Sequence, residues 1–236
     1  MSAPVLKVEG LNARYGAAQV LFDVALSLAS GEVLALMGRN GAGKSTTLKA
    51  IIGLVDADGE VHFDDTRIDP WPAHRIASAG LGYVPEDRRV FADLSVMENL
   101  EVGRQPAREG RDPWTPERLF SLFPNLAEMR NRRAAQMSGG EQQMLTIART
   151  LMGNPSVILL DEPSEGLAPV IVERMAEAVT ALKAEGLSIL LCEQNLFFAK
   201  AVSDRASVIE GGQIRWNGTM VDLFENEDVR RDYLSV

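Results

Sequence analysis

Residues 38–46 read Gly38-Arg39-Asn40-Gly41-Ala42-Gly43-Lys44-Ser45-Thr46, a glycine-rich segment that ends in Lys-Ser-Thr. It fits the pattern Gly-x-x-x-x-Gly-Lys-Ser, in which glycines let the backbone bend around phosphate groups and successive N–H groups face the anion. The short apolar run Glu32 to Met37 before it is typical of a buried strand, and Ser45 to Ile52 after it has helical periodicity. Together they predict a phosphate-binding loop, with Lys44 reaching the β and γ phosphates and the Ser45 hydroxyl binding Mg²⁺.

The patterns on either side of this loop predict an α/β fold. Residues 5–13 and 20–28 alternate as strands of a partly exposed sheet, and residues 59–68 suit a strand pair with a tight turn. Apolar runs at 157–160 and 187–191 indicate buried strands, with an amphipathic helix over 171–184 between them. This alternation predicts a mostly parallel sheet with helices on its faces. The tail is expected to form a hairpin over 208–216 and then helices over 220–234.

The sequence pattern changes from alternating strands and helices to mainly helices between about residues 87 and 152, where we expect an inserted helical subdomain. Helical patterns cover 96–104, 116–123 and 141–152, and a polar loop rich in proline and glycine covers 106–113. We expect the insertion to belong to a single domain that runs over 5–236.

A second motif, Val157-Ile158-Leu159-Leu160-Asp161-Glu162, places two acids at the end of an apolar run. In a parallel sheet, ligands bind outside the carboxyl ends of the strands. We therefore expect Asp161 to hold Mg²⁺ or its waters and Glu162 to polarise an attacking water. Apolar strands often end in acids, so the motif indicates nucleotide hydrolysis only in combination with the phosphate loop.

A third motif, Met137-Ser138-Gly139-Gly140-Glu141-Gln142, precedes a helix rich in Leu, Ile and Ala. Ser138 can cap this helix, and the two glycines allow close backbone approach. The motif is either a second anion-binding helix start or an ordinary helix cap.

Length and composition narrow the class of protein. The chain has 236 residues, enough for one α/β domain with a smaller inserted subdomain. Its net charge of −9 argues against nucleic acid as the main partner and against unaided attachment to an anionic membrane. The single cysteine, Cys192, lies in an apolar run, so we expect a buried, inert thiol and a reducing compartment. No apolar run approaches the roughly 18 residues that a membrane span needs.

The order of the three motifs resembles that of ATP-binding-cassette (ABC) ATPases over about residues 5–234. The resemblance implies a phosphate-loop NTPase fold with a RecA-like core, an antiparallel N-terminal β subdomain and an inserted helical subdomain. It implies ATP and Mg²⁺ as cofactors, with nucleotide contacts from residues 38–46 and from Ser138, Gly139, Gly140 and Glu141. Two chains would pair head to tail, each ATP lying between Lys44 of one and Ser138 of the other. Closing on ATP and opening after hydrolysis would drive a membrane partner.

Four positions match functional positions of the family. At each of them either the role is open or the residue differs from the one usual in the family. Tyr15 matches the aromatic residue that stacks on adenine, although it can instead pack on the core. Ser164-Glu165-Gly166-Leu167 matches the loop that crosses the dimer interface, where Asp is usual at the end. Glu86 stands where the family has a Gln that contacts Mg²⁺ and the attacking water, so it either tightens metal binding or titrates upward. Gln194 stands where the family has a His that reaches the γ-phosphate.

An amide at position 194 can donate a hydrogen bond but carries no positive charge and moves no proton. We therefore hypothesise that Glu162 is the base and that hydrolysis proceeds without a histidine switch.

These departures resemble one branch of the importers. Five segments are similar to the second ATPase subunit of branched-chain amino acid importers: 84–91, 94–100, 162–169, Glu193-Gln194-Asn195 and 229–234. The implied partners are two transmembrane permease subunits, a paralogous ATPase or a second copy of the chain and, indirectly, a periplasmic solute-binding protein. The implied location is the cytoplasmic face of the inner membrane. Relatives import urea, short amides or aromatic acids, and Glu86 favours amino acids because the urea branch more often has Gln there.

A helix of the membrane subunit is expected to dock beside the segment that carries Glu86. Val90, Phe91 and Leu94 either line this docking groove or belong to the core. Arg88 and Arg89 either meet acids of the partner or remain solvated.

Two other classes of protein have to be weighed. A soluble ABC ATPase that acts on DNA or ribosomes usually carries a coiled coil, a zinc insertion or two cassettes, none of which is present here. A GTPase or small-molecule kinase is disfavoured by Ser138-Gly139-Gly140 and by the lack of an Asn-Lys-x-Asp motif.

Overall fold

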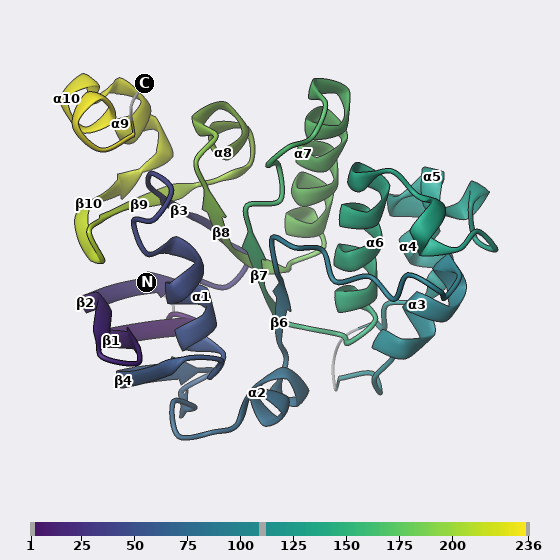
Figure 1. The fold of residues 1–236 in the computed structure, drawn as a ribbon, viewed down its shortest axis with the longest axis horizontal. Helices are drawn as coiled ribbons and strands as arrows, with labels where there is room; N and C mark the ends of the chain where they lie inside the picture. The colour runs from purple at the N-terminus through teal and green to yellow at the C-terminus, as the bar shows by residue number, and fades with distance from the viewer. Residues whose placement is uncertain (1–2, 109–111, 235–236) are drawn as a thin grey trace.

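A computed structural model describes residues 3–108 and 112–234. Its larger sheet contains β3 (Val33–Met37), β6 (Leu81–Val84), β7 (Val157–Asp161), β8 (Ser188–Glu193), β9 (Arg205–Glu210) and β10 (Gln213–Thr219). Its smaller sheet contains β1 (Leu6–Tyr15), β2 (Ala18–Leu28), β4 (Asp56–Phe63) and β5 (Thr66–Arg67). Figure 1 shows the two sheets with helices around them.

The strand order is β10-β9-β3-β8-β7-β6 in the larger sheet and β2-β1-β4-β5 in the smaller. All neighbours from β9 to β6 pair in parallel, and only β10 is antiparallel. The smaller sheet is antiparallel throughout. The predicted combination of a mostly parallel sheet and an antiparallel N-terminal sheet is confirmed.

The helices follow the sheets in two groups. Those outside the expected insertion are α1 (Lys44–Ile51), α2 (Ala73–Ala79), α7 (Pro169–Ala184), α8 (Leu196–Val202), α9 (Met220–Glu225), α10 (Glu227–Val229) and the π-helical turn η2 (Arg230–Leu234). Those within residues 87–152 are α3 (Val96–Gly103), α4 (Pro116–Leu122), α5 (Pro124–Glu128), the 3-10 turn η1 (Ala134–Gln136) and α6 (Gly139–Leu151). This second group gathers at one end of the molecule (Figure 1). Residues 109–111 of the expected polar loop and residues 235–236 of the expected domain lie outside the described part.

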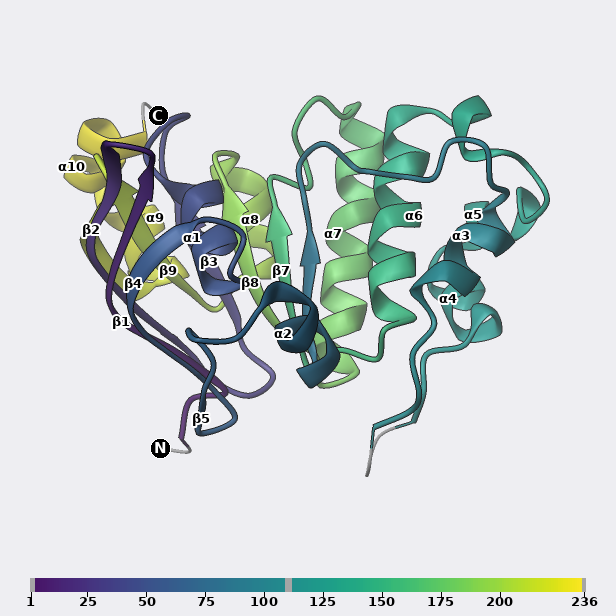
Figure 2. The same cartoon turned by 60° about the horizontal axis from the view of Figure 1, so that its bottom comes forward.

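The two faces of the larger sheet are covered by different layers. Leu34 and Leu36 of β3 share a buried cluster with Leu48 of α1 and with the smaller sheet, so α1 lies between the sheets. Ile158 and Leu160 of β7 share another cluster with α6 and α7 on the opposite face. Figure 2 shows α6 and α7 side by side on that face. Each fully buried Leu or Ile contributes about 1.5–3 kcal/mol, so these alternating side chains fix which face each strand presents.

Five short elements were not expected from the sequence: α2, β6, α8 and, within residues 87–152, α5 and η1. Strand β6 has only four residues and includes Gly82, which weakens a strand pattern. Helices α2 and α8 have seven residues each, too few for periodicity to be informative. Cys192 is buried as expected, and burial raises the pKa of its thiol.

Candidate nucleotide-binding and hydrolysis site

The phosphate loop begins where β3 ends at Met37 and finishes where α1 begins at Lys44. Gly43 precedes α1 with a φ of 116°, a left-handed conformation that favours glycine, and a Cβ there would lie 2.8 Å from the Leu21 side chain. A Cβ on Gly38 would lie 2.5 Å from the carbonyl oxygen of Ile209. No side chain caps α1, so the N–H groups at its start remain available to an anion.

Lys44 is buried beneath this loop with its ammonium group fully engaged. Its Nζ donates to the carbonyl oxygens of Gly38 at 2.8 Å and Arg39 at 3.1 Å. It also lies 3.0 Å from Oε1 of Glu162, with side-chain exposures of 3% for Lys44 and 8% for Glu162. The structure thus brings Lys44 and Glu162 together. We expect nucleotide phosphates to displace the Glu162 carboxylate from Lys44.

Asp161 is buried, and each of its carboxylate oxygens has a hydroxyl partner. Ser45 Oγ donates to Oδ1 at 2.8 Å, and the Tyr83 hydroxyl donates to Oδ2 at 3.1 Å. Burial raises the pKa of Asp161, whereas the two hydroxyl groups act in the opposite direction because they favour the charged form. Hydroxyl and carboxylate oxygens are the hard ligands that Mg²⁺ prefers, so Ser45 and Asp161 fit the predicted metal site. Tyr83 was missed, because nothing in a strand pattern shows where a tyrosine hydroxyl is directed.

Glu162 and the segment after it are tied to the end of β8. The Glu162 N–H donates to the carbonyl oxygen of Cys192 at 3.0 Å. The Ser164 N–H donates to Oε1 of Glu193 at 3.0 Å, and the Asn195 N–H donates to Oε2 at 3.1 Å. Glu193 was missed as a site residue, although an acid that ends an apolar run is the signal that identified Asp161.

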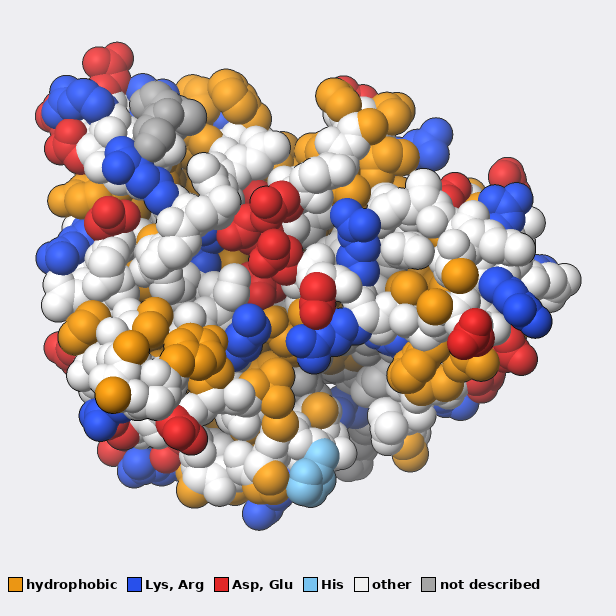
Figure 3. All heavy atoms as spheres, viewed as in Figure 1, with side chains coloured by type: hydrophobic (Ala, Val, Ile, Leu, Met, Phe, Trp, Pro, Cys, Tyr) orange, Lys and Arg blue, Asp and Glu red, His pale blue; other side chains and the backbone are white. Residues whose placement is uncertain are grey.

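Acidic groups concentrate at this edge of the sheet. A hydrogen bond to Glu162 raises the pKa of Glu165 to about 7, with further contributions from burial and from the charges of Glu162, Glu86 and Glu193. Figure 3 shows acidic side chains gathered in the middle of this face, above the carboxyl ends of β7 and β8. Such a concentration of negative charge repels a bare triphosphate, so we expect the nucleotide to enter together with its metal ion.

Three further predicted residues lie on the surface. Glu86 and Gln194 are both exposed, one after β6 and the other after β8. Tyr15 ends β1 with 49% exposure, and its ring makes no aromatic or cation contact within the described residues. Their assigned contacts with nucleotide and metal stay predictions.

The Ser138 motif forms the start of α6. The Ser138 hydroxyl accepts from the Glu141 N–H at 3.4 Å, and the Ser138 N–H donates to the Glu141 carboxylate at 2.7 Å. A Cβ on Gly140 would lie 2.6 Å from Ile171, and one on Gly139 would lie 2.5 Å from the Arg88 guanidinium. Figure 1 shows α7 between α6 and the strands that flank the phosphate loop. One chain therefore does not join the Ser138 motif to its own Lys44.

A groove of about 620 Å³ lies between α2 and β6 on one side and the ends of α3 and α6 on the other. Leu54, Phe91 and Val102 line it as exposed apolar side chains, together with Tyr83. Phe91 therefore belongs to the groove, whereas Val90 packs against the buried core.

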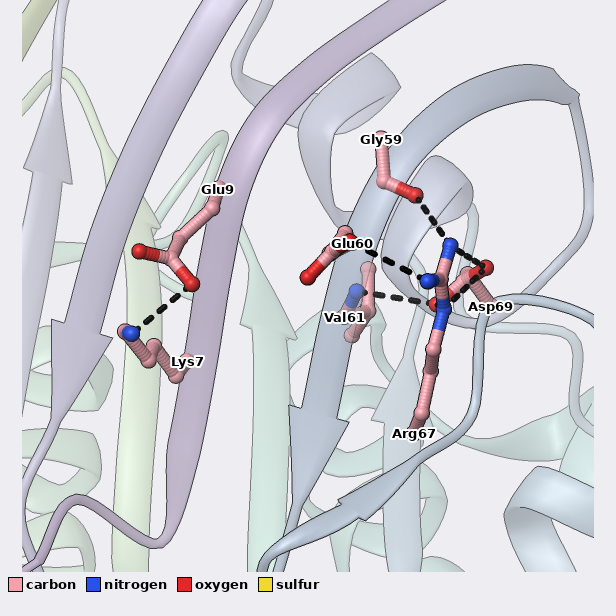
Figure 4. Close-up of polar contacts among 7 residues, drawn as sticks. All are labelled: Lys7, Glu9, Gly59, Glu60, Val61, Arg67 and Asp69. Atoms are coloured by element: carbon pink, nitrogen blue, oxygen red, sulfur yellow. Dashed lines mark hydrogen bonds and ion pairs between the residues drawn. The ribbon is translucent and has the colours of Figure 1, made fainter.

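Another group of possible metal ligands lies on the smaller sheet. Ligand atoms of Glu9, Glu60 and His62 lie within 4.8 Å of one another. Figure 4 shows that the two carboxylates face cations: Glu9 lies 2.7 Å from the Lys7 Nζ, and Glu60 lies 3.1 Å from an Arg67 nitrogen. Ordinary surface ion pairs account for this group.

The comparisons with known proteins all find ATP-binding proteins of transport systems. The ABC transporter family model matches residues 21–165, more than half of the chain. The chain is 40% identical over 231 residues to the high-affinity branched-chain amino acid transport ATP-binding protein BraG of Pseudomonas aeruginosa, covering 98% of this chain and 99% of BraG. It is 35% identical over 233 residues to the lipopolysaccharide export system ATP-binding protein LptB of Haemophilus influenzae, covering 98% and 97%. The solved ADP conformation of MJ1267, an ATP-binding cassette of an ABC transporter, superimposes with a TM-score of 0.82 at 26% identity over 98% of both chains.

Geometry and comparisons agree on the class, a phosphate-loop nucleoside triphosphatase. Within that class the chain belongs to the ABC transporter family, and its activity is ATP hydrolysis. Across the described residues, 3–108 and 112–234, none of the helices has the length and apolar character to cross a membrane.

Proposed function

We propose that the chain is the ATP-hydrolysing subunit of an importer for branched-chain amino acids. The observation that carries this proposal is the higher identity to BraG than to LptB, over nearly the full length of all three chains. Glu86 and Gln194 support it, because both departures resemble the branched-chain amino acid branch.

The proposed reaction is attack of water on the γ-phosphate of ATP. Lys44 and the N–H groups at the start of α1 bind the phosphates. Glu162, once displaced from Lys44, accepts the proton of the attacking water. Gln194 donates a hydrogen bond toward the γ-phosphate. Ser45, Asp161 and Glu86 would hold Mg²⁺, which would supply positive charge to offset the negative charge of the β and γ phosphates.

The second half of the proposed site comes from another ATPase chain, either a copy of this one or a paralogue. Its Ser138, Gly139 and Gly140 equivalents would present the start of a helix to the γ-phosphate. Ser138 is exposed in the single chain, as this arrangement requires.

The proposed membrane partner occupies the groove beside Phe91. Three large apolar side chains, Leu54, Phe91 and Val102, are each about half exposed there, which is unusual on a solvated surface. A short amphipathic helix of a transmembrane permease subunit would cover them and hold the chain at the cytoplasmic face of the membrane.

Reconstitution tests the substrate. The chain is combined with its permease subunits and paired ATPase in ATP-loaded vesicles, and uptake of labelled leucine is measured with the periplasmic binding protein present. We expect uptake that excess valine or isoleucine suppresses. Uptake of urea, short amides or aromatic acids instead, or ATP-driven extraction of lipopolysaccharide, would contradict the proposal.

A groove variant tests the membrane contact. Phe91→Glu should leave ATP hydrolysis by the paired ATPase chains without permease unchanged and should abolish co-purification with the permease subunits, because a charge replaces an apolar contact. The matched control is Val221→Glu, an exposed apolar position on α9. Equal co-purification of the two variants would refute the groove as the docking site.

A further inference from the structure

We propose that Glu193 is a positioning residue for ATP hydrolysis: its buried carboxylate joins the segment that carries Glu162 to the turn that carries Gln194. The proposal rests on the roles proposed above for Glu162 and Gln194.

The contacts of Glu193 come from two different segments. Glu193 is the last residue of β8 and is only 2% exposed. One carboxylate oxygen accepts from the Ser164 N–H at 3.0 Å and the other from the Asn195 N–H at 3.1 Å. Hydrogen bonds to a charged acceptor are stronger than neutral ones, and both donors are backbone groups with fixed directions. The carboxylate therefore fixes the distance between the loop after β7 and the turn after β8.

The backbone of Glu162 needs this support. Its φ is 46°, a left-handed conformation that a residue with a Cβ adopts only where its surroundings hold it there. Two contacts with the end of β8 flank it: its own N–H donates to the Cys192 carbonyl, and the Ser164 N–H donates to Glu193. Loss of the second contact would let Glu162 relax and turn its carboxylate away from the attacking water.

Gln194 is held by the same carboxylate from the other side. Gln194 lies between Glu193 and Asn195. The Asn195 N–H donates to the Glu193 carboxylate, and this hydrogen bond closes a turn around Gln194. Asn195 is itself fixed, because its Oδ1 accepts from the N–H groups of Phe197 and Phe198 at 3.1 Å each at the start of α8. Gln194 is thus an exposed residue between two anchored residues of the turn.

One consequence concerns the second ATPase chain. Ser164-Glu165-Gly166-Leu167 is the segment predicted to cross the interface between the two chains. Because Glu193 binds the first residue of that segment, a shift of the segment when the partner arrives moves the turn that carries Gln194. Docking of the partner and alignment of the hydrolytic residues would then be a single event.

The test is Glu193→Gln, which has nearly the same shape. An amide has one acceptor oxygen, and its NH₂ group would face an N–H donor, so one of the two contacts is lost. We expect kcat to fall roughly 10- to 100-fold, while the KM and the measured Kd for ATP stay unchanged, because the phosphate loop is untouched. Glu193→Asp restores the charge with shorter reach and should recover part of the kcat.

The matched control is Glu32→Gln. Glu32 is also a buried carboxylate that accepts a backbone N–H, that of Ala29 at 2.6 Å, but it lies before β3 at the opposite edge of the sheet. It should share any loss of melting temperature and keep its kcat. A kcat for Glu193→Gln equal to that of Glu32→Gln would overturn the proposal. Amide hydrogen exchange of the unaltered protein gives a second measurement: the Ser164 and Asn195 N–H groups should be protected together, and an unprotected Ser164 would also overturn it.

Glu162→Gln is measured alongside, because it distinguishes a failure of Glu162 as the base from a failure of Glu193 as a positioning residue. If that variant keeps full turnover, the proposed base is wrong. If it loses turnover and Glu193→Gln does not, the base stands and only the role of Glu193 fails.

Discussion

The two nucleotide-facing motifs differ in how complete they are within one chain. At the phosphate loop, Lys44 and Asp161 are buried, and every polar group on their side chains has a partner from the same chain. At the start of α6, Ser138 is exposed, and its hydrogen bonds are satisfied by Glu141 of its own helix. This contrast supports the proposal that one chain binds the nucleotide and that a second ATPase chain supplies the other half of the hydrolytic site.

The largest expected effect comes from Glu162→Gln. The variant removes both the proposed base and the carboxylate that competes with phosphate for Lys44. Turnover should fall by about 10²- to 10⁴-fold, while ATP binding is retained or strengthened. Single-turnover hydrolysis and binding of a fluorescent ATP analogue measure the two effects. A loss of less than tenfold in turnover, with Glu32→Gln as the reference, would place the base elsewhere.

Tyr83→Phe tests how far the phosphate-loop half depends on residues outside the motifs. It removes the hydroxyl that donates to Asp161 and keeps the ring in the groove. We expect the Mg²⁺ concentration needed for half-maximal effect to rise by about 10- to 100-fold. The shift should appear both in hydrolysis and in the thermal stabilisation of the protein by ADP. Tyr233→Phe, a half-buried tyrosine of η2, is the control, and an equal shift in both variants would exclude a specific role for Tyr83.

The smallest expected effect concerns the acids beside Glu162. Because the pKa of Glu165 is raised to about 7 in the folded chain, the folded state binds its proton more tightly than the unfolded state does. The associated stability is fully present below the unfolded pKa, near 4.5, and is lost as the pH rises through about 7. Melting of the nucleotide-free protein should therefore show a smaller decline across this window in Glu165→Gln. Glu173→Gln, an exposed acid of α7, should decline as the unaltered protein does; a similar decline in Glu165→Gln would contradict the raised pKa.

The sequence predicted most of the phosphate-loop half, because that half depends on local spacing. Gly43 and Lys44 follow directly from the motif, and Asp161 follows from its place at the end of an apolar strand. Contacts between distant segments were out of reach: Tyr83 and Asp161 are 78 residues apart and meet only because β6 and β7 are neighbours in the sheet. The pairing of Lys44 with Glu162 was equally hidden, because Lys44 had been assigned to the phosphates and Glu162 to the attacking water.

The Ser138 motif shows what a local pattern cannot predict, which is a contact with another chain. The motif is typical of the family, and the structure shows a capped helix start, yet the group that this helix start is proposed to bind lies in another chain. No pattern within one sequence reports a contact between chains.

Ser138→Arg tests whether one chain binds ATP and a second ATPase chain completes the hydrolytic site. ATP binding and turnover are measured on the same preparation. We expect the Kd for ATP to stay close to that of the unaltered protein and turnover to fall on the order of 100-fold, because only the partner-facing helix start is changed. Hydrolysis by Ser138→Arg at the unaltered rate would contradict the account, since it would show that a single chain already holds everything the reaction needs.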